Sequence, residues 1–232
     1  MLSAWSPDDK MCSLLSQIRI LRGCSRAQLA ELGRSARILR VDPERHLVEQ
    51  GDAPTSIYLV AFGRVRLNVF GESGREMILG DVDAGGFFGD EALSGAPLQR
   101  ATAIAVEETT VLAVPAAAFA SFMGSHPRVA VDFGAQLSRQ LHAACEAVAG
   151  LGLLSVEQRL LRALEQLGQQ NGSHGPEGLF LPARPTHREL AARVGARRET
   201  VTRMLDSLMR RGLVVAKGRA ALLLTHAALR AA

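Results

Sequence analysis

The side chains with the clearest capacity for chemistry lie in VGARRETVTRMLDSLMRRGLV, residues 194–214. Polar residues fall on the outward face of a helix predicted there: Arg197, Arg198, Glu199, Thr202 and Arg203. The opposite face is apolar and carries Val201, Leu205 and Leu208. Arginine can pair bidentately with guanine, and glutamate can accept a hydrogen bond from the amino group of cytosine. The outward face therefore has the chemistry to distinguish G·C from A·T base pairs.

A second helix is predicted directly before this one. Thr186 and Glu189 in PTHREL have the spacing of a capping box, in which each side chain satisfies a free backbone amide. Gly195 is expected to end that helix, because a residue without a Cβ adopts the left-handed conformation at low cost. Two short helices across a glycine turn form a helix-turn-helix, whose second helix enters the major groove of DNA.

The residues that follow, LVVAKGRAALLLT, predict two strands around a turn. Such a hairpin forms a wing, and its cations are expected to contact phosphate groups. The predicted DNA-binding residues are Thr186, Arg197, Arg198, Glu199, Thr202, Arg203, Lys217 and Arg219.

The distribution of charge supports a polyanionic partner for the C-terminal part. From residue 151 onward the chain has 13 Lys or Arg and 6 Asp or Glu, a balance of +7. Residues 1–150 have 14 and 17, a balance of −3. A solvated basic face would show the same asymmetry, so charge alone does not establish nucleic-acid binding.

Composition and length indicate an ordinary globular protein of two domains, with 232 residues, 47% hydrophobic and 22% charged. We expect a cytoplasmic protein without membrane contact, because no apolar run reaches the roughly 18 residues of a membrane span and no leader pattern opens the chain. Three cysteines without a CxxC pair argue against a disulfide framework, a zinc knuckle or an iron–sulfur cluster.

A second candidate site is GGFFGDEALSGAPLQRAT, residues 85–102. Four glycines and a proline surround two adjacent carboxylates and one arginine, which is the composition of a tight backbone cradle beside a charged pocket. The alternative is that the glycines serve only the geometry of a structural turn.

The helices and strands that position these two sites can be predicted from the pattern of apolar residues along the chain. SRAQLAELGRSA predicts a short helix that begins after Ser25. Residues 36–123 contain short apolar runs separated by glycine turns, which predicts an antiparallel β-roll. Another helix is expected from Ser155 to Gln170, ending in a loop, NGSHGPEG.

A long helix is predicted after Pro127, with small and apolar residues at alternating steps of four and three: Ala130, Gly134, Leu137, Leu141, Ala144, Val148 and Leu151. This spacing is typical of a coiled-coil seam, so we expect two copies of the chain to pair along it. Gly134 favours close approach of a partner backbone, because glycine inside a helix costs about 1 kcal/mol relative to alanine. The alternative is that the same stripe packs on the β-roll of its own chain.

With these motifs in place, the chain resembles the cyclic-AMP receptor protein and fumarate-nitrate reduction regulator (Crp/Fnr) superfamily over nearly its whole length. In that family an Arg-Glu-Thr-Val run and a later arginine contact bases, which implies this role for Arg198, Glu199 and Arg203. The resemblance implies an α+β fold: a cyclic-nucleotide-binding-like β-roll at 1–127, a dimerisation helix and hinge at 128–154, and a winged helix-turn-helix at 155–232. One departure is Arg197, where relatives have a Ser or Thr cap.

FFGDEALSGAPLQRAT resembles the family's phosphate-binding cassette but departs from it. Aligned without gaps, Asp90 replaces a Glu that binds ribose, Gln99 stands where an Arg binds the cyclic phosphate, and Arg100 follows one position later. The implied effector-pocket residues are Gly89, Asp90, Glu91, Ala92, Gln99, Arg100, Ala101, Ala144 and Cys145. A buried phosphate needs a paired cation, so cyclic-nucleotide sensing is disfavoured, and a different effector or none is preferred.

The sequence therefore predicts a homodimeric DNA-binding regulator that recognises an inverted repeat, with RNA polymerase as a further partner and no established cofactor. A regulator that binds cyclic AMP or cyclic GMP through Arg100 stays open, as does haem ligated by His46, His126 or His142, or an architectural DNA binder without a switch. A jelly-roll metalloenzyme is a distant alternative, because residues 36–123 contain one histidine, His46.

Overall fold

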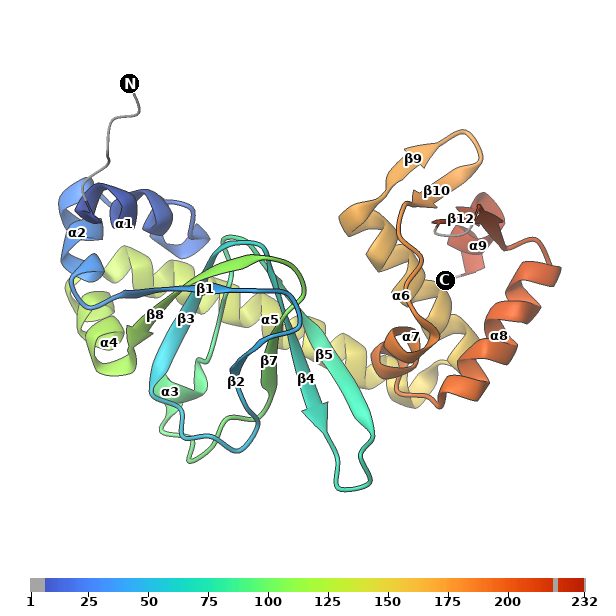
Figure 1. The fold of residues 1–232 in the computed structure, drawn as a ribbon, viewed down its shortest axis with the longest axis horizontal. Helices are drawn as coiled ribbons and strands as arrows, with labels where there is room; N and C mark the ends of the chain where they lie inside the picture. The colour runs from blue at the N-terminus through green and yellow to red at the C-terminus, as the bar shows by residue number, and fades with distance from the viewer. Residues whose placement is uncertain (1–6, 219–220, 232) are drawn as a thin grey trace. The chain divides into compact units, whose positions relative to one another are not determined.

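A computed structural model describes residues 7–218 and 221–231 of the chain, which forms two compact units (Figure 1). One unit comprises the described residues through Gly74 and Leu79–Leu141. The other comprises Arg75–Ile78 and the described residues from His142 onward. The expected α+β class is confirmed, because sheets and helices follow one another in both units.

The elements up to the long helix are α1 (Pro7–Leu15), a 3₁₀ turn (Arg19–Leu21), α2 (Arg26–Gly33), β1 (Arg37–Val41), β2 (His46–Val48), β3 (Ser56–Phe62), β4 (Arg64–Phe70), β5 (Glu76–Asp83), β6 (Phe87–Phe88), α3 (Glu91–Ser94), β7 (Thr102–Ala105), β8 (Thr109–Pro115), α4 (Ala116–Ser125) and α5 (Pro127–Leu153). The predicted short helix is α2, and its capping box joins Ser25 to Gln28. Helix α1 was not predicted, and α4 is a helix where the β-roll was expected to continue to residue 123.

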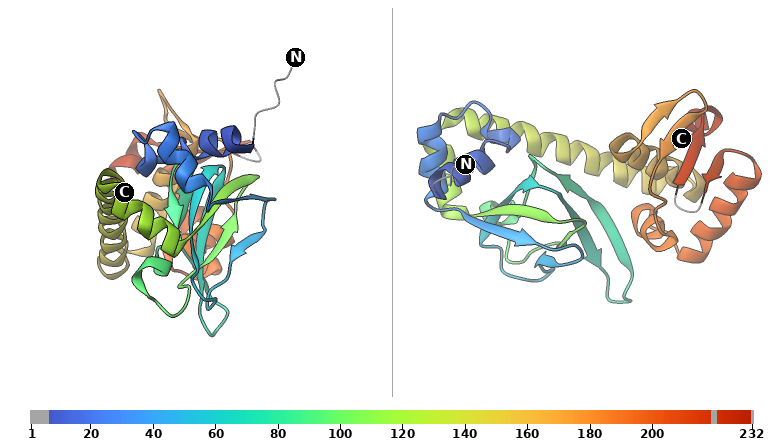
Figure 2. Two further views of the ribbon diagram at one scale, coloured as in Figure 1. Left: turned by 90° about the vertical axis from the view of Figure 1, so that its left-hand side faces the viewer. Right: turned by 45° about the horizontal axis from the view of Figure 1, so that its top comes forward.

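The predicted β-roll consists of two four-stranded sheets, β1-β8-β3-β6 and β2-β7-β4-β5. A small core from both sheets, Val60, Val65, Phe88, Ala103 and Val111, holds them face to face. A larger core joins β3 and β8 to the helices, with Leu15 of α1, Phe119 of α4 and Phe133 of α5 among its members. Helices α1, α2 and α4 accordingly gather around the beginning of α5, as both views of Figure 2 show.

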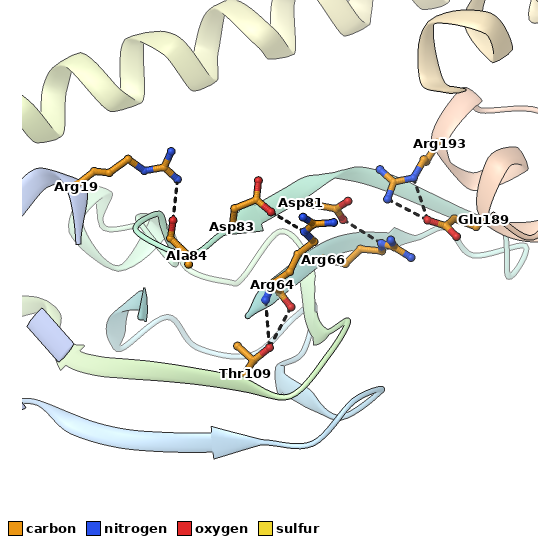
Figure 3. A network of polar contacts seen from close by, with 9 residues as sticks. All are labelled: Arg19, Arg64, Arg66, Asp81, Asp83, Ala84, Thr109, Glu189 and Arg193. Atoms are coloured by element: carbon orange, nitrogen blue, oxygen red, sulfur yellow. Dashed lines mark hydrogen bonds and ion pairs between the residues drawn. The ribbon is translucent and has the colours of Figure 1, made fainter. Parts of the chain in front are cut away.

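Hydrogen bonds fix the register of the hairpin β4–β5. The Arg64 guanidinium donates to Asp83 at 2.5 Å, and that of Arg66 donates to Asp81 at 3.0 Å (Figure 3). The hydroxyl of Thr109 lies within hydrogen-bond distance of both backbone polar groups of Arg64. These contacts hold the turn Phe62–Arg64 and the strands on either side in one geometry.

The second unit contains α6 (Val156–Asn171), β9 (Ser173–Gly175), β10 (Gly178–Leu181), α7 (His187–Val194), α8 (Arg198–Arg210), β11 (Val214–Lys217), β12 (Ala221–Thr225) and α9 (His226–Ala231). Strands β11, β12, β10 and β9 form an antiparallel sheet in that order. Leucines of α6 pack with the inner faces of α7 and α8 and with β12 in one core. The prediction of a loop over NGSHGPEG is wrong, because Ser173–Gly175 pairs with Gly178–Phe180 as a hairpin.

Candidate DNA-binding interface and effector region

The N-cap at Thr186 and the glycine turn at Gly195 form as predicted. Thr186 caps α7 by accepting a hydrogen bond from the amide of Glu189 at 3.1 Å. The Glu189 carboxylate, which was expected to complete the capping box, accepts hydrogen bonds from Arg193 at 3.1 and 3.2 Å (Figure 3). Gly195 follows with φ 63°, the left-handed conformation that lets the chain turn directly into α8.

The second helix, α8, has an apolar inner face and a charged outer one. Val201, Leu205 and Leu208 are fully buried in the core of the second unit. Exposed side chains occupy the start of the helix: Arg197, Arg198, Glu199 and Arg203. The structure thus brings the predicted base-reading residues together on one solvent-facing surface, with Thr202 half-buried beside them.

Arg197 occupies the N-cap of α8 with extended backbone angles, and its side chain makes no capping hydrogen bond. The first amides of α8 therefore lack the side-chain acceptor that Ser or Thr would supply, and a cation stands at the positive end of the helix dipole. This arrangement favours an anion at the start of the helix.

The wing is present as predicted, with β11 paired to β12. Lys217 ends β11, and its ammonium lies 2.7 Å from Glu177 in the turn before β10. A phosphate group would have to compete with Glu177 for this exposed cation. Arg219, the other cation predicted for the wing, lies outside the described residues.

Arg159 of α6 ties the end of the long helix to the helix-turn-helix. Its guanidinium donates to the carbonyl of Leu154 at 2.7 Å and to the carbonyl of Val194 at 2.9 Å. The first carbonyl follows the last turn of α5, and the second ends α7 before Gly195. One cation thus satisfies free carbonyls at two helix C-termini, a link that sequence spacing did not reveal.

The cradle segment has the tight geometry that its glycines indicated. Gly89 has φ 81°, and a Cβ at this position would lie 2.8 Å from the carbonyl oxygen of Ser56. The chain then enters the single turn of α3 at Glu91. Ala92 is half-buried and Ala101 is buried. Gly89 is thus required by the fold itself, and it would be required with or without an effector.

Gln99 and Arg100 of the cradle lie in different surroundings. Gln99 is buried, at 5% exposure, whereas 73% of the Arg100 side chain is exposed. Arg100 donates from Nε to the Glu91 carboxylate at 3.2 Å. The backbone of Gln99 pairs with Gly51 and Asp52, which fixes its inward orientation. The buried position is therefore occupied by a neutral amide, and the nearby cation is already paired.

Asp90 lies beside this ion pair and is partly buried. Burial raises the pKa of its carboxyl group, and the negative charge of Glu91 raises it further, against smaller lowering effects of a hydrogen bond from its own backbone and of the charge of Arg100. The folded state therefore retains the Asp90 proton to higher pH than the unfolded state does.

We expect Asp90→Asn to be more stable than the wild type at pH 7. Because the pKa of Asp90 is higher in the folded state, its ionisation lowers the free energy of unfolding as pH rises from the pKa of the unfolded state, about 3.9, through that of the folded state. Below about pH 3.9 the carboxyl group is protonated in both states, so this loss of stability is absent. Melting temperatures measured from pH 3.5 to 8 should therefore diverge as pH rises. Asp42→Asn, which changes an exposed carboxylate of the same unit, is the control. Equal melting profiles for Asp90→Asn and the wild type would contradict the prediction.

The predicted seam lies on an exposed face of α5. Leu141 is 67% exposed and Val148 is 70% exposed, and Ala130, Gly134, Ala144 and Leu151 are exposed as well. Only Leu137 among the seam residues is partly covered by the core of its own unit. The helix packs on its own β-roll through a different face, which carries Val129, Phe133 and Gln136. Cys145, next to the seam, is also exposed.

The three histidines considered as haem ligands lie on separate elements. His46 in β2 lies 3.4 Å from Glu49, and His142 in α5 lies 3.5 Å from Glu146. His126 follows α4, where its Nδ1 lies 2.9 Å from the carbonyl of Phe122. Each is thus engaged by a local partner.

Comparison with known proteins agrees with this architecture. Residues 38–126 match the family model of the cyclic nucleotide-binding domain, and residues 158–232 match that of the Crp-like helix-turn-helix domain. The cyclic AMP receptor protein of Thermus thermophilus is 37% identical over 168 residues, which cover 71% of this chain and 73% of the relative.

Solved structures show the same fold. A c-di-GMP responsive global regulator from Xanthomonas campestris has a TM-score of 0.77 at 24% identity, covering 86% of this chain and 99% of that one. A CRP/FNR-family transcriptional regulator from Thermus thermophilus has a TM-score of 0.70 at 27% identity, covering 84% and 97%.

A cyclic-nucleotide-binding fold joined to a winged helix-turn-helix defines a DNA-binding transcription regulator, and the relatives are regulators rather than enzymes. The chain belongs to the Crp/Fnr family. Among residues 7–218 and 221–231, no helix combines the length and apolar character needed to cross a membrane.

Proposed function

We propose that the protein is a homodimeric, sequence-specific transcription regulator that binds an inverted repeat and whose effector region does not accept cyclic AMP or cyclic GMP. Within it, residues 1–127 form the sensing domain, 128–154 the dimerisation helix and hinge, and 155–232 the DNA-binding domain. A regulator of this kind acts on the chromosome, which places it in the cytoplasm.

The exposed face of α5 supports the homodimer. Most of the alternating stripe of small and large apolar residues on α5 is exposed in the single chain, whereas the face that meets the β-roll is separate. Around the position of a Cβ on Gly134 there is open space within 4 Å, so no close contact in its own chain requires glycine there. A second α5 in parallel register accounts for both features, because a glycine lets two helix backbones approach.

A dimer gives the DNA-binding surface its geometry. Two α8 helices related by a twofold axis would enter successive major grooves about 34 Å apart, so the operator is an inverted repeat. Arg198, Glu199 and Arg203 would contact base edges, while Arg197, Thr186 and Lys217 would contact the phosphate backbone. RNA polymerase would be a further partner if the dimer activates transcription.

The hydrogen bonds of Arg159 support a path from the dimer helix to DNA. A change in how two α5 helices pack would move the carbonyl of Leu154, and Arg159 would transmit that movement to the end of α7. The spacing of the two recognition helices would change as a result, which is the usual form of a switch between two conformations.

The observation that speaks most strongly against a cyclic nucleotide is the buried, neutral Gln99 beside an exposed Arg100. Arg100 is the only Lys or Arg between Arg75 and Arg128 in the sequence, and it neutralises Glu91. A phosphate monoanion placed here would meet Asp90 and Glu91, and the one cation of this segment is already paired. Burying a charge without compensation costs several kcal/mol, so the residues present do not fit a cyclic phosphate.

The double variant Gln99→Arg/Arg100→Ser is expected to gain cyclic-nucleotide binding. It moves the single cation of the segment into the buried position, where it lacks a partner until an anion binds. We therefore expect a lower melting temperature than the wild type without ligand, and a rise when cyclic AMP is added. Ligand at 100 times its Kd stabilises by about 2.7 kcal/mol.

Isothermal titration calorimetry of both proteins with cyclic AMP and cyclic GMP provides the measurement. The wild type should give no binding heat at micromolar concentrations. Micromolar binding of either nucleotide by the wild type would contradict this part of the proposal and favour a regulator that uses Arg100. The single variant Arg100→Ser is the matched control for the loss of the ion pair with Glu91.

A further inference from the structure

A hydrogen-bonded pair within the helix-turn-helix, His187 of α7 and Thr202 of α8, bears on how a base is read. The Thr202 hydroxyl oxygen lies 3.0 Å from the carbonyl oxygen of Arg198, one turn earlier in α8. It also lies 2.8 Å from Nδ1 of His187 at the beginning of α7. The second contact joins the two helices at the surface that faces DNA in the proposed function.

The direction of both hydrogen bonds follows from the number of hydrogens. A hydroxyl carries one hydrogen, and a carbonyl oxygen can only accept. Thr202 must therefore donate to the carbonyl of Arg198. The His187 contact is then attractive only if Nδ1 carries a hydrogen and donates it to the Thr202 oxygen. This argument selects the imidazole tautomer of neutral His187 that is protonated on Nδ1.

Thr202 consequently has no hydrogen left for a base. Guanine and adenine N7, guanine O6 and thymine O4 are acceptors in the major groove, and Thr202 cannot donate to them while both hydrogen bonds hold. The methyl group of its side chain takes no part in these hydrogen bonds. Thymine presents a C5-methyl group in the same groove, and contact with a threonine methyl is one of the pairings that suits it.

We propose that Thr202 recognises one thymine per half-site through its methyl group, and that His187 is the positioning residue that holds the hydroxyl away from the base. Positions four residues apart share one face of a helix, so this thymine lies next to the base contacted by Arg198. The inference rests on the proposed DNA-binding function, and it adds His187 to the residues that determine the operator.

Replacing each operator thymine by uracil tests the methyl contact, because uracil lacks only the C5-methyl group. The operator is first obtained by selecting bound duplexes from random DNA with the wild-type protein. Uracil at the position that Thr202 recognises should weaken wild-type binding about fourfold for each half-site that is substituted, which is the value expected for one buried methyl group. Thr202→Val keeps a methyl group and loses the hydroxyl, so it should keep this sensitivity. Thr202→Ser keeps the hydroxyl and loses the methyl group, so its binding should no longer be sensitive to the replacement of thymine by uracil.

Variants of His187 test the positioning role. His187→Ala should reduce the preference for thymine over uracil at that position and leave the preference at other positions unchanged. His187→Asn should restore it, because the asparagine amide nitrogen can donate from nearly the place of Nδ1. His174→Ala, which removes an exposed histidine in β9 of the same unit, should behave as the wild type.

The outcomes separate this inference from the proposed function. If the wild type selects an operator but Thr202→Ser and the wild type respond alike to every uracil, methyl recognition is wrong. If Thr202→Val loses the preference for thymine over uracil while Thr202→Ser keeps it, the methyl group of Thr202 does not carry that preference and the inference is overturned. If the wild type selects no operator at all, both the proposed function and the inference about Thr202 fail.

Discussion

A Leu141→Lys variant is expected to be monomeric and to bind operator DNA at least about a hundredfold more weakly than the wild type, because both half-sites are no longer held by one linked molecule. Leu141 is exposed in the single chain and occupies the middle of the proposed seam. In a parallel pair of α5 helices, the substitution would bring two lysines together and remove two buried leucines. Burial of each leucine contributes about 1.5–3 kcal/mol.

Ala143→Lys provides the matched control, because it adds the same charge to an exposed position on α5 outside the seam. Sedimentation equilibrium should give a dimer for the wild type and Ala143→Lys and a monomer for Leu141→Lys. The melting temperature of Leu141→Lys at high dilution should match that of the diluted wild type, since the substituted side chain is solvated within one chain. A dimeric Leu141→Lys protein would show that the chains do not pair through this face.

The second large effect is expected for Arg198→Ala. A bidentate contact to a base contributes about 1–3 kcal/mol of discrimination, so preference at one base pair of each half-site should fall by roughly 10- to 100-fold. Affinity for scrambled DNA should change much less, and preference at the other positions should persist. Competition binding with operators changed one base pair at a time measures this profile.

Arg197→Ser, one residue earlier, is expected to lower DNA affinity without changing sequence preference, in contrast to Arg198→Ala. Serine at the N-cap of α8 would accept from a free amide and remove a cation from the positive end of the helix, raising stability by about 1 kcal/mol. The loss of a phosphate contact should weaken operator and scrambled DNA alike and reduce the salt dependence of binding. If Arg197→Ser and Arg198→Ala changed specific and scrambled binding in equal proportion, this division of roles would be wrong.

Local signals in the sequence predicted much of the fold. Ser25 and Thr186 each cap the helix that was expected to follow them, and Gly195 adopts the left-handed angle inferred from its position. These signals work because a cap or a positive φ is a property of a few adjacent residues. The prediction failed for NGSHGPEG, where composition indicated a loop. Pairing with residues 178–180 forms β9 there, and glycine content does not reveal which strand lies alongside.

The arrangement of the candidate DNA-contacting residues was easier to predict than that of the cradle. Arg198, Glu199 and Arg203 belong to one helix, so their common face follows from helical spacing. The cradle depends on contacts between separate segments, such as the backbone pairing of Gln99 with Asp52. The pair of His187 with Thr202 and the link from Arg159 to Val194 also join different helices, and no spacing rule predicts them.

Selection of bound duplexes from a random pool, followed by footprinting of the enriched sequence, tests the central proposal most directly. We expect an inverted repeat whose half-site centres lie about one helical turn, roughly 34 Å, apart, with one protein dimer bound across it. Enrichment of a single asymmetric half-site by a monomer, or no enrichment over random competitor, would contradict the proposal that paired α8 helices read palindromic DNA.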